Sequence, residues 1–211
     1  MSNLSTKKLR GYLNPRYLKN PIITGTFFLT AAGIVTKLIG FFYRIFLSRT
    51  FHEESLGIFG LLGPVMMLVH AVCASGIQNA ITRFVAASKK DKSAEAYGYL
   101  FTGIAISAFL SGAMAYLIFH HAPYIAIQFI GERRCIPLLR ICALSFPLAT
   151  LHSCINGFFY GLKRAAIPAW SMIIEQSCRV VTVYILCRLS VQAGLNISLS
   201  YICVGLLAGE F

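Results

Sequence analysis

Six apolar stretches, each close to the length of a membrane-spanning helix, recur along this chain of 211 residues. They cover residues 22–48, 56–82, 96–119, 136–160, 167–188 and 195–211. A spanning helix needs about 20 consecutive, mostly apolar residues. Charged residues make up only 12% of the chain, whereas an ordinary soluble domain carries about 25%. The sequence therefore predicts an all-α fold, a polytopic membrane helix bundle with about six spans.

The pattern divides the chain into a basic N-terminal segment, residues 1–21, and a transmembrane bundle, residues 22–211. No A-x-A-like cleavage site follows the first apolar stretch, so we expect an uncleaved span there. The stretch HHAPYIAIQFIGERR lies between the third and fourth spans and is too polar to cross; it predicts an interfacial segment or short helix. No basic residue follows the last apolar stretch, so we expect the sixth span to be truncated.

Basic residues strongly outnumber acidic ones: 19 Lys and Arg face 7 Asp and Glu, a formal net charge of +12. In a soluble chain this excess would indicate a nucleic-acid partner, but membrane proteins gather Lys and Arg in their cytoplasmic loops. We therefore expect no nucleic acid and a cytoplasmic N-terminus. The seven cysteines contain no C-x-x-C pair and are expected to act as small apolar packing residues.

Two cations lie on one face of the first span. At 100° per residue, Lys37 and Arg44 share that face with small and hydroxyl residues, while bulky apolar residues cover the rest of the helix. Such a face is expected to point into a bundle interior or a wet cavity. The alternative is that Arg44 extends its charged end to the membrane surface.

The fifth span carries an acid and a base near its middle. Glu175 and Arg179 are four residues apart and share one face, so each can partly neutralise the other. A charge at the centre of a bilayer costs about 2.5–3.5 kcal/mol, so we expect the pair to face the bundle interior. The pair is either part of a substrate site or purely structural.

The fourth span carries a weaker polar signal. His152 and Asn156 lie together with Ser145. They are expected either to bind substrate or to form hydrogen bonds between helices.

These polar faces predict a shared central cavity with a net positive charge, from Lys37, Arg44 and Arg179 against Glu175. A positive cavity attracts anions, and among substrates of membrane size the phosphate or diphosphate group suits Arg and Lys best. The sequence contains no H-E-x-x-H, G-x-S-x-G or P-loop motif and few carboxylates. We therefore expect neither an enzyme, nor a metal site, nor a cofactor.

Three segments resemble a known family: GIVTKLIGFFYRIFLSRTF…ESLGIFGLLGPV, then SGIQNAITRFVA, then INGFFYGLKRAAIPAWSMIIEQSCRVV. They are similar to the stage V sporulation protein B group of polysaccharide-biosynthesis membrane proteins. That group belongs to the multidrug/oligosaccharidyl-lipid/polysaccharide exporter superfamily, which includes flippases for lipid-linked peptidoglycan precursors. The resemblance runs from about residue 25 to residue 190, and its most specific pattern extends from Gly157 to Arg179.

The resemblance implies two helical bundles around a cleft that opens to each face of the bacterial cytoplasmic membrane in turn. This chain would supply the first bundle, and its partners would be membrane lipids and a second lobe or a continuation of the chain. The implied function is a flippase for lipid-linked oligosaccharide or peptidoglycan precursors, tied to synthesis of the sporulation cell wall. Two alternatives stay open: a drug/cation antiporter of the same superfamily, and a truncated membrane scaffold that does not transport.

Overall fold

The computed structural model describes residues 21–51, 53–88, 93–192 and 199–210, and every element in these ranges is a helix. In chain order they are α3 (Pro21–Thr50), α4 (Glu53–His70), η1 (Ala71–Ser75), α5 (Gly76–Ala87), α6 (Ser93–Tyr124), η2 (Ile125–Ile130), α7 (Cys135–Gly161), α8 (Ala166–Gln192) and α9 (Ser200–Glu210). The π-helices η1 and η2 continue their neighbours, so six helical stretches match the six apolar segments. The predicted all-α helix bundle is confirmed, while residues 1–20 of the basic segment lie outside the described residues.

Four of the helices are long and apolar enough to cross a membrane: Gly25–Thr50, Glu53–Ala87, Ala94–Ile130 and Cys135–Gly161. The other two predicted spans differ from these. Helix α8 has 27 residues and is therefore about 40 Å long, but Glu175, Gln176 and Arg179 lower its hydropathy. Helix α9 is a shorter apolar helix of 11 residues.

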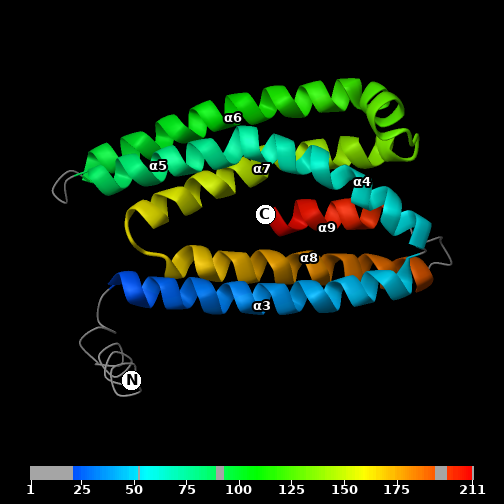
Figure 1. Ribbon diagram of the computed structural model, residues 1–211, viewed down its shortest axis with the longest axis horizontal. Coiled ribbons are helices and arrows are strands. Elements are labelled where there is room, and N and C mark those ends of the chain that lie inside the picture. The colour runs from blue at the N-terminus through cyan, green and yellow to red at the C-terminus, as the bar shows by residue number, and fades with distance from the viewer. Residues whose placement is uncertain (1–20, 52, 89–92, 193–198, 211) are drawn as a thin grey trace, which may run out of the picture.

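The helices form two groups with α9 between them (Figure 1). One group contains α4, α5, α6 and α7, and the other is the pair α3 and α8, which lie side by side. Helix α9 packs against both α7 and α8 and so connects the groups. Three clusters of buried residues hold this arrangement: one centred on α4 and α7, one on α5, α6 and α7, and one on α3, α8 and α9.

The polar stretch after the third span is not a separate interfacial segment, so that prediction is wrong. Helix α6 continues through Pro123 and passes into η2, which ends at Ile130. The helix stops at Gly131, whose φ of 79° suits glycine, and the backbone N–H groups of Gly131 and Glu132 both donate to the carbonyl of Ala126. The apolar residues of the sequence IAIQFI keep the chain helical until this glycine.

Gly57, Gly60 and Gly63, which lie before Pro64 near the start of α4, do not mark a close approach between helices. A Cβ atom added to any of the three would meet nothing within 4 Å, and α4 runs through Pro64 without a break. The departure from α-helical geometry comes later, at η1. Tight packing is found instead at Gly157, where an added Cβ would lie 2.8 Å from the carbonyl oxygen of Gln78.

The outer surface of the bundle is rich in large apolar side chains. Phe109 is 80% exposed, Phe129 75% and Phe27 71%. A soluble monomer rarely exposes this much apolar surface, whereas lipid requires it. The cysteines are free, and six of the seven are buried, which confirms their role as packing residues.

The close contact at Gly157 gives a prediction about packing. In Gly157→Ala the new methyl group meets the backbone of α5, and Thr82, whose Oγ1 donates to the Gly157 carbonyl at 3.0 Å, must move with it. We expect a loss of about 1–3 kcal/mol, seen as a lower melting temperature of the purified protein in detergent. The control is Gly112→Ala, because an added Cβ there meets nothing within 4 Å. Equal melting temperatures for the two variants would contradict this packing.

Candidate functional site

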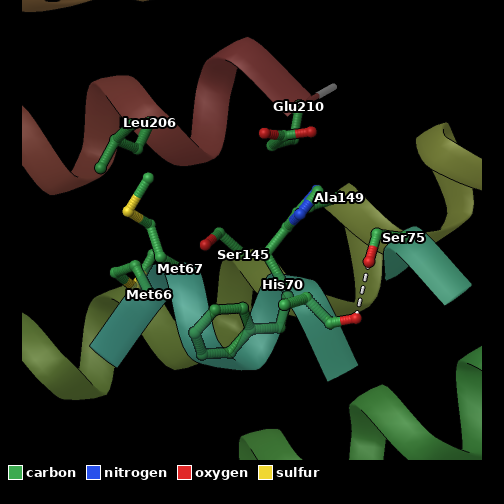
Figure 2. Close-up of a pocket in the computed structure, with 10 residues that line it drawn as sticks. Met66, Met67, His70, Ser75, Ser145, Ala149, Leu206 and Glu210 are labelled. Atoms are coloured by element: carbon green, nitrogen blue, oxygen red, sulfur yellow. Dashed lines mark hydrogen bonds between the residues drawn. The ribbon is translucent and has the colours of Figure 1, made fainter. Parts of the chain in front are cut away.

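Two adjoining pockets lie inside the bundle where α4, α7 and α9 meet. The first has a volume of about 530 Å³ and is lined in part by His70, Ser145 and Glu210. Figure 2 shows His70 of α4 extending across this pocket toward the side where Glu210 of α9 lies. The second has a volume of about 680 Å³ and reaches Arg44 and Ser48 of α3. Met66, Met67 and Leu206 line both pockets, so the two pockets lie next to each other.

The shape of α4 explains why this region is hollow. Gly60 and Gly63 line the second pocket without side chains. Helix η1 begins directly after His70, and Ala71 and Ser75 from this π-helical turn line the first pocket. Single π-helical turns inside α-helices occur frequently at functional sites.

A cluster of charged side chains joins α7, α8 and α9 beside the first pocket. Nη2 of Arg179 lies 2.7 Å from Oε1 of Glu175 and 4.0 Å from Oε1 of Glu210. Nδ1 of His152 lies 3.8 Å from Oε2 of Glu175 and 3.6 Å from Oε2 of Glu210. The four side chains are between 17% and 23% exposed, so water is largely removed from them. Buried charges of this kind persist only when they are paired.

The other ring nitrogen of His152 has two polar neighbours. Nε2 lies within hydrogen-bond distance of the hydroxyl of Ser171 on α8 and 3.1 Å from Nδ2 of Asn156, one turn along α7. An amide nitrogen donates, so this geometry assigns Nε2 as an acceptor and places the ring proton on Nδ1, facing the two carboxylates. The imidazole is therefore held on both sides, by hydrogen bonds at one nitrogen and by acidic groups at the other.

Helix α9 reaches the cluster because its glycines allow it to lie tightly against α8. A Cβ at Gly205 would meet Cγ2 of Val183 at 2.3 Å, and a Cβ at Gly209 would lie 3.2 Å from the carbonyl oxygen of Glu175. This G-x-x-x-G spacing is typical of close helix packing in membranes. The residue after Gly209 is Glu210, and the tight contact therefore brings its carboxylate to Arg179.

The structure brings together four of the six residues that the sequence analysis selected. Glu175, Arg179, His152 and Asn156 form one network, and the predicted pairing of Glu175 with Arg179 is present as an i, i+4 ion pair. Arg44 lines the second pocket, outside this network.

The sixth residue, Lys37, is exposed and shares its helix face with Arg44. Among the described residues, neither of these two cations forms an ion pair. Within the described part of the chain, both positive charges are therefore free to pair with an anionic ligand.

Sequence reasoning missed Glu210. The signal was present, because the GLLAG sequence before it (residues 205–209) predicts a close helix contact. The consequence is electrostatic: the cluster holds two carboxylates against one guanidinium, so it carries one net negative charge while His152 is neutral. A positive charge on the pocket wall comes from Arg44 of α3, which lines the second pocket.

In the part of the chain that the structure describes, no group of three or more His, Cys, Asp or Glu residues is placed to hold a metal ion. The site combines an apolar cavity, with Arg44 of α3 on its wall, and a cluster of one guanidinium, two carboxylates and an imidazole between α7, α8 and α9. Cavities with apolar walls and a few convergent polar groups are typical ligand sites.

Comparison with known proteins identifies the class. Residues 22–211 match the family model described as polysaccharide biosynthesis protein, and the chain therefore belongs to this family of membrane proteins. The chain is also similar to stage V sporulation protein B of Bacillus subtilis (strain 168), with 27% identity over 194 residues. The match covers 91% of this chain and 37% of that protein, so the chain spans little more than a third of its relative's length. No solved structure shows significant similarity. The predicted resemblance is confirmed.

The shared guanidinium gives a prediction about stability. Arg179→Gln leaves the carboxylates of Glu175 and Glu210 without a guanidinium, and we expect a loss on the order of 2 kcal/mol. In the double variant Arg179→Gln/Glu210→Gln one carboxylate is removed with the cation, so at least half of this loss should be recovered. The stability of both variants is measured by their melting temperature and by their abundance in the membrane.

Arg140→Gln is the matched control, because the Arg140 guanidinium lies 5.4 Å from the centre of the Phe119 ring and outside the cluster. This variant should leave the melting temperature nearly unchanged. Strictly additive losses in the Arg179→Gln/Glu210→Gln pair would mean that these residues do not interact.

Proposed function

We propose that this chain forms the first helical lobe of a flippase that moves lipid-linked oligosaccharide or peptidoglycan precursors across the bacterial cytoplasmic membrane. The observation that carries the proposal is the cationic Arg44 on the wall of an apolar cavity within a bundle whose outer surface is also apolar. Such a cavity suits the headgroup of a lipid whose sugar is attached through phosphate. Membership of the polysaccharide biosynthesis family supports transport rather than catalysis.

The diphosphate of the substrate is the group that the cations would recognise. Arg forks onto phosphate oxygens and Lys supplies a point charge, so Arg44 and Lys37 would hold the headgroup from α3. The cluster of His152, Asn156, Glu175 and Arg179 would form the opposite side of the substrate site. The apolar residues that the two pockets share, Met66, Met67 and Leu206, would contact the less polar parts of the ligand.

Alternating access requires a second wall, which a second lobe or a continuation of the chain would supply. We place the N-terminus in the cytoplasm, because the end of α5 and the turn between α7 and α8 lie toward the same end of the bundle as the start of α3 (Figure 1). These two segments carry Arg83, Lys163 and Arg164. The opposite end carries Arg134 paired with Glu54 at 2.7 Å. The name of the sporulation relative supports a role in sporulation.

A second candidate function is a cation antiporter of the same superfamily. The observation in its favour is the pair of carboxylates, Glu175 and Glu210, both near the first pocket. A cationic drug would need this negative charge and would be repelled by Arg44. A scaffold that does not transport, the third reading, would need neither group.

Complementation of a strain that lacks the transporter separates these functions. Arg44→Gln removes the phosphate contact, and loss of one such charge-assisted contact costs about 1.5–3 kcal/mol, or about tenfold or more in affinity. We expect transport of the lipid-linked precursor to fall by that factor at normal expression. The effect of Lys37→Gln should be smaller, because Lys37 shares the helix face of Arg44 but lines neither of the two pockets. Arg49→Gln, on the same helix but outside the lining of both pockets, is the control and should complement fully.

Full activity of both Arg44→Gln and Lys37→Gln would contradict the flippase proposal. Improved export of a cationic dye in these variants would support the antiporter instead. If substitutions at Glu175 and Glu210 also leave activity unchanged, the scaffold is supported.

A further inference from the structure

We propose that His152, held between Glu175 and Glu210, is a proton-binding site whose occupancy raises the affinity of the adjoining cavity for an anionic headgroup. This inference rests on the proposed function and extends it, since it assigns a coupling ion to the same cavity. The argument starts from the neighbours of the imidazole. Its Nδ1 faces both carboxylates, at 3.8 Å and 3.6 Å, and its Nε2 accepts from Asn156 and contacts Ser171.

Proton uptake needs only small movements in this network. A proton from water binds Nε2, which then donates to the hydroxyl oxygen of Ser171 instead of accepting a hydrogen bond. The amide of Asn156, which is partly buried, rotates by half a turn so that its oxygen faces the ring. Both nitrogens of the imidazolium are then donors, and its charge lies beside Glu175 and Glu210.

The charged groups around His152 come from three other helices. Helix α8 contributes Glu175 and Arg179, α9 contributes Glu210, and α4 contributes His70 from across the pocket. The contacts of α5 with this part of α7 are made by Gln78 and Thr82, which do not titrate near neutral pH. On the side of α7 that faces α6, the thiol of Cys154 approaches the Gly103 carbonyl.

Glu175 and Glu210 share the guanidinium of Arg179, and this sharing couples the protonation of His152 to the binding of an anionic headgroup. While His152 is neutral, one guanidinium serves two carboxylates, and the cluster adds a negative charge beside the first pocket. When His152 is protonated, the imidazolium and the guanidinium together balance Glu175 and Glu210. Nε of Arg179 is buried and has no hydrogen-bond partner among the described residues, so the guanidinium retains a free donor.

Removal of that negative charge favours a phosphate in the first pocket, which Glu210 lines, and in the adjoining pocket, which Arg44 lines. By thermodynamic linkage the effect is reciprocal, so a bound anion must raise the affinity of His152 for its proton. An electrochemical proton gradient would then bias loading and release of the headgroup at opposite faces of the membrane.

The test measures binding of a soluble diphosphate diester, uridine diphosphate N-acetylglucosamine, to the purified full chain in detergent. Its phosphates stay ionised across the neutral range, so any change of affinity with pH belongs to the protein. We expect the affinity to rise about fivefold or more from about pH 8 to about pH 5. Calorimetry in buffers of different ionisation enthalpy should show net proton uptake on binding at intermediate pH.

Variants assign the effect to one residue. His152→Gln keeps a polar side chain and should bind the probe with an affinity that no longer rises at low pH. The control is His120→Gln, because His120 is exposed and its ring stacks on Tyr116. This variant should keep the full rise in affinity at low pH. If His70→Gln removes the rise in affinity at low pH and His152→Gln does not, the assignment of the proton site to His152 is wrong.

The outcomes separate this inference from the function on which it rests. Binding that depends on Arg44 but is equal at both pH values, without proton uptake, overturns the proton site and leaves the flippase proposal intact. The absence of binding at every pH contradicts the anionic substrate itself.

Discussion

The guanidinium of Arg179 is shared between the carboxylates of Glu175 and Glu210, and this interaction determines how the two helix groups meet. An unpaired charge at this depth would cost several kcal/mol, so the helices that carry the three groups must approach closely. Helix α9 provides that approach, because Gly205 and Gly209 place its backbone against α8. The same helix packs on α7 and so connects the α3–α8 pair with the rest of the bundle.

The cavity follows from the same constraint. Helix α4 faces α9 with Gly60, Gly63 and the π-helical turn after His70, so the space between these two helices is not filled. The side chains that remain at its walls are of two kinds, with apolar residues over most of the surface and charges at opposite sides. A lipid with an anionic headgroup has the same two parts, which is why the proposed substrate fits the site.

Much of the fold was predictable from the sequence, because long apolar segments in a membrane protein have few alternatives to helices. The predictions from sequence failed where the backbone geometry determines how far a helix extends. The helix that contains α6 extends to Ile130 because Gly131, which adopts a positive φ, ends it there. For the site, the i, i+4 spacing predicted the Glu175–Arg179 pair, but the role of Glu210 required knowledge of how α9 lies on α8.

Photocrosslinking from the shared wall of the two pockets tests the central claim, that the anionic headgroup occupies this cavity. A benzophenone side chain at Met67, which is 76% exposed and lines both pockets, is compared with one at Phe109, which is 80% exposed on the outer surface. We predict that a lipid-linked diphosphate sugar is captured at position 67 in membranes, and that an excess of the soluble diphosphate sugar suppresses this capture. Capture at position 109 reflects the lipid tail and should not respond to the soluble competitor. Capture at position 67 that resists the competitor, or no capture there while transport proceeds, would contradict the account.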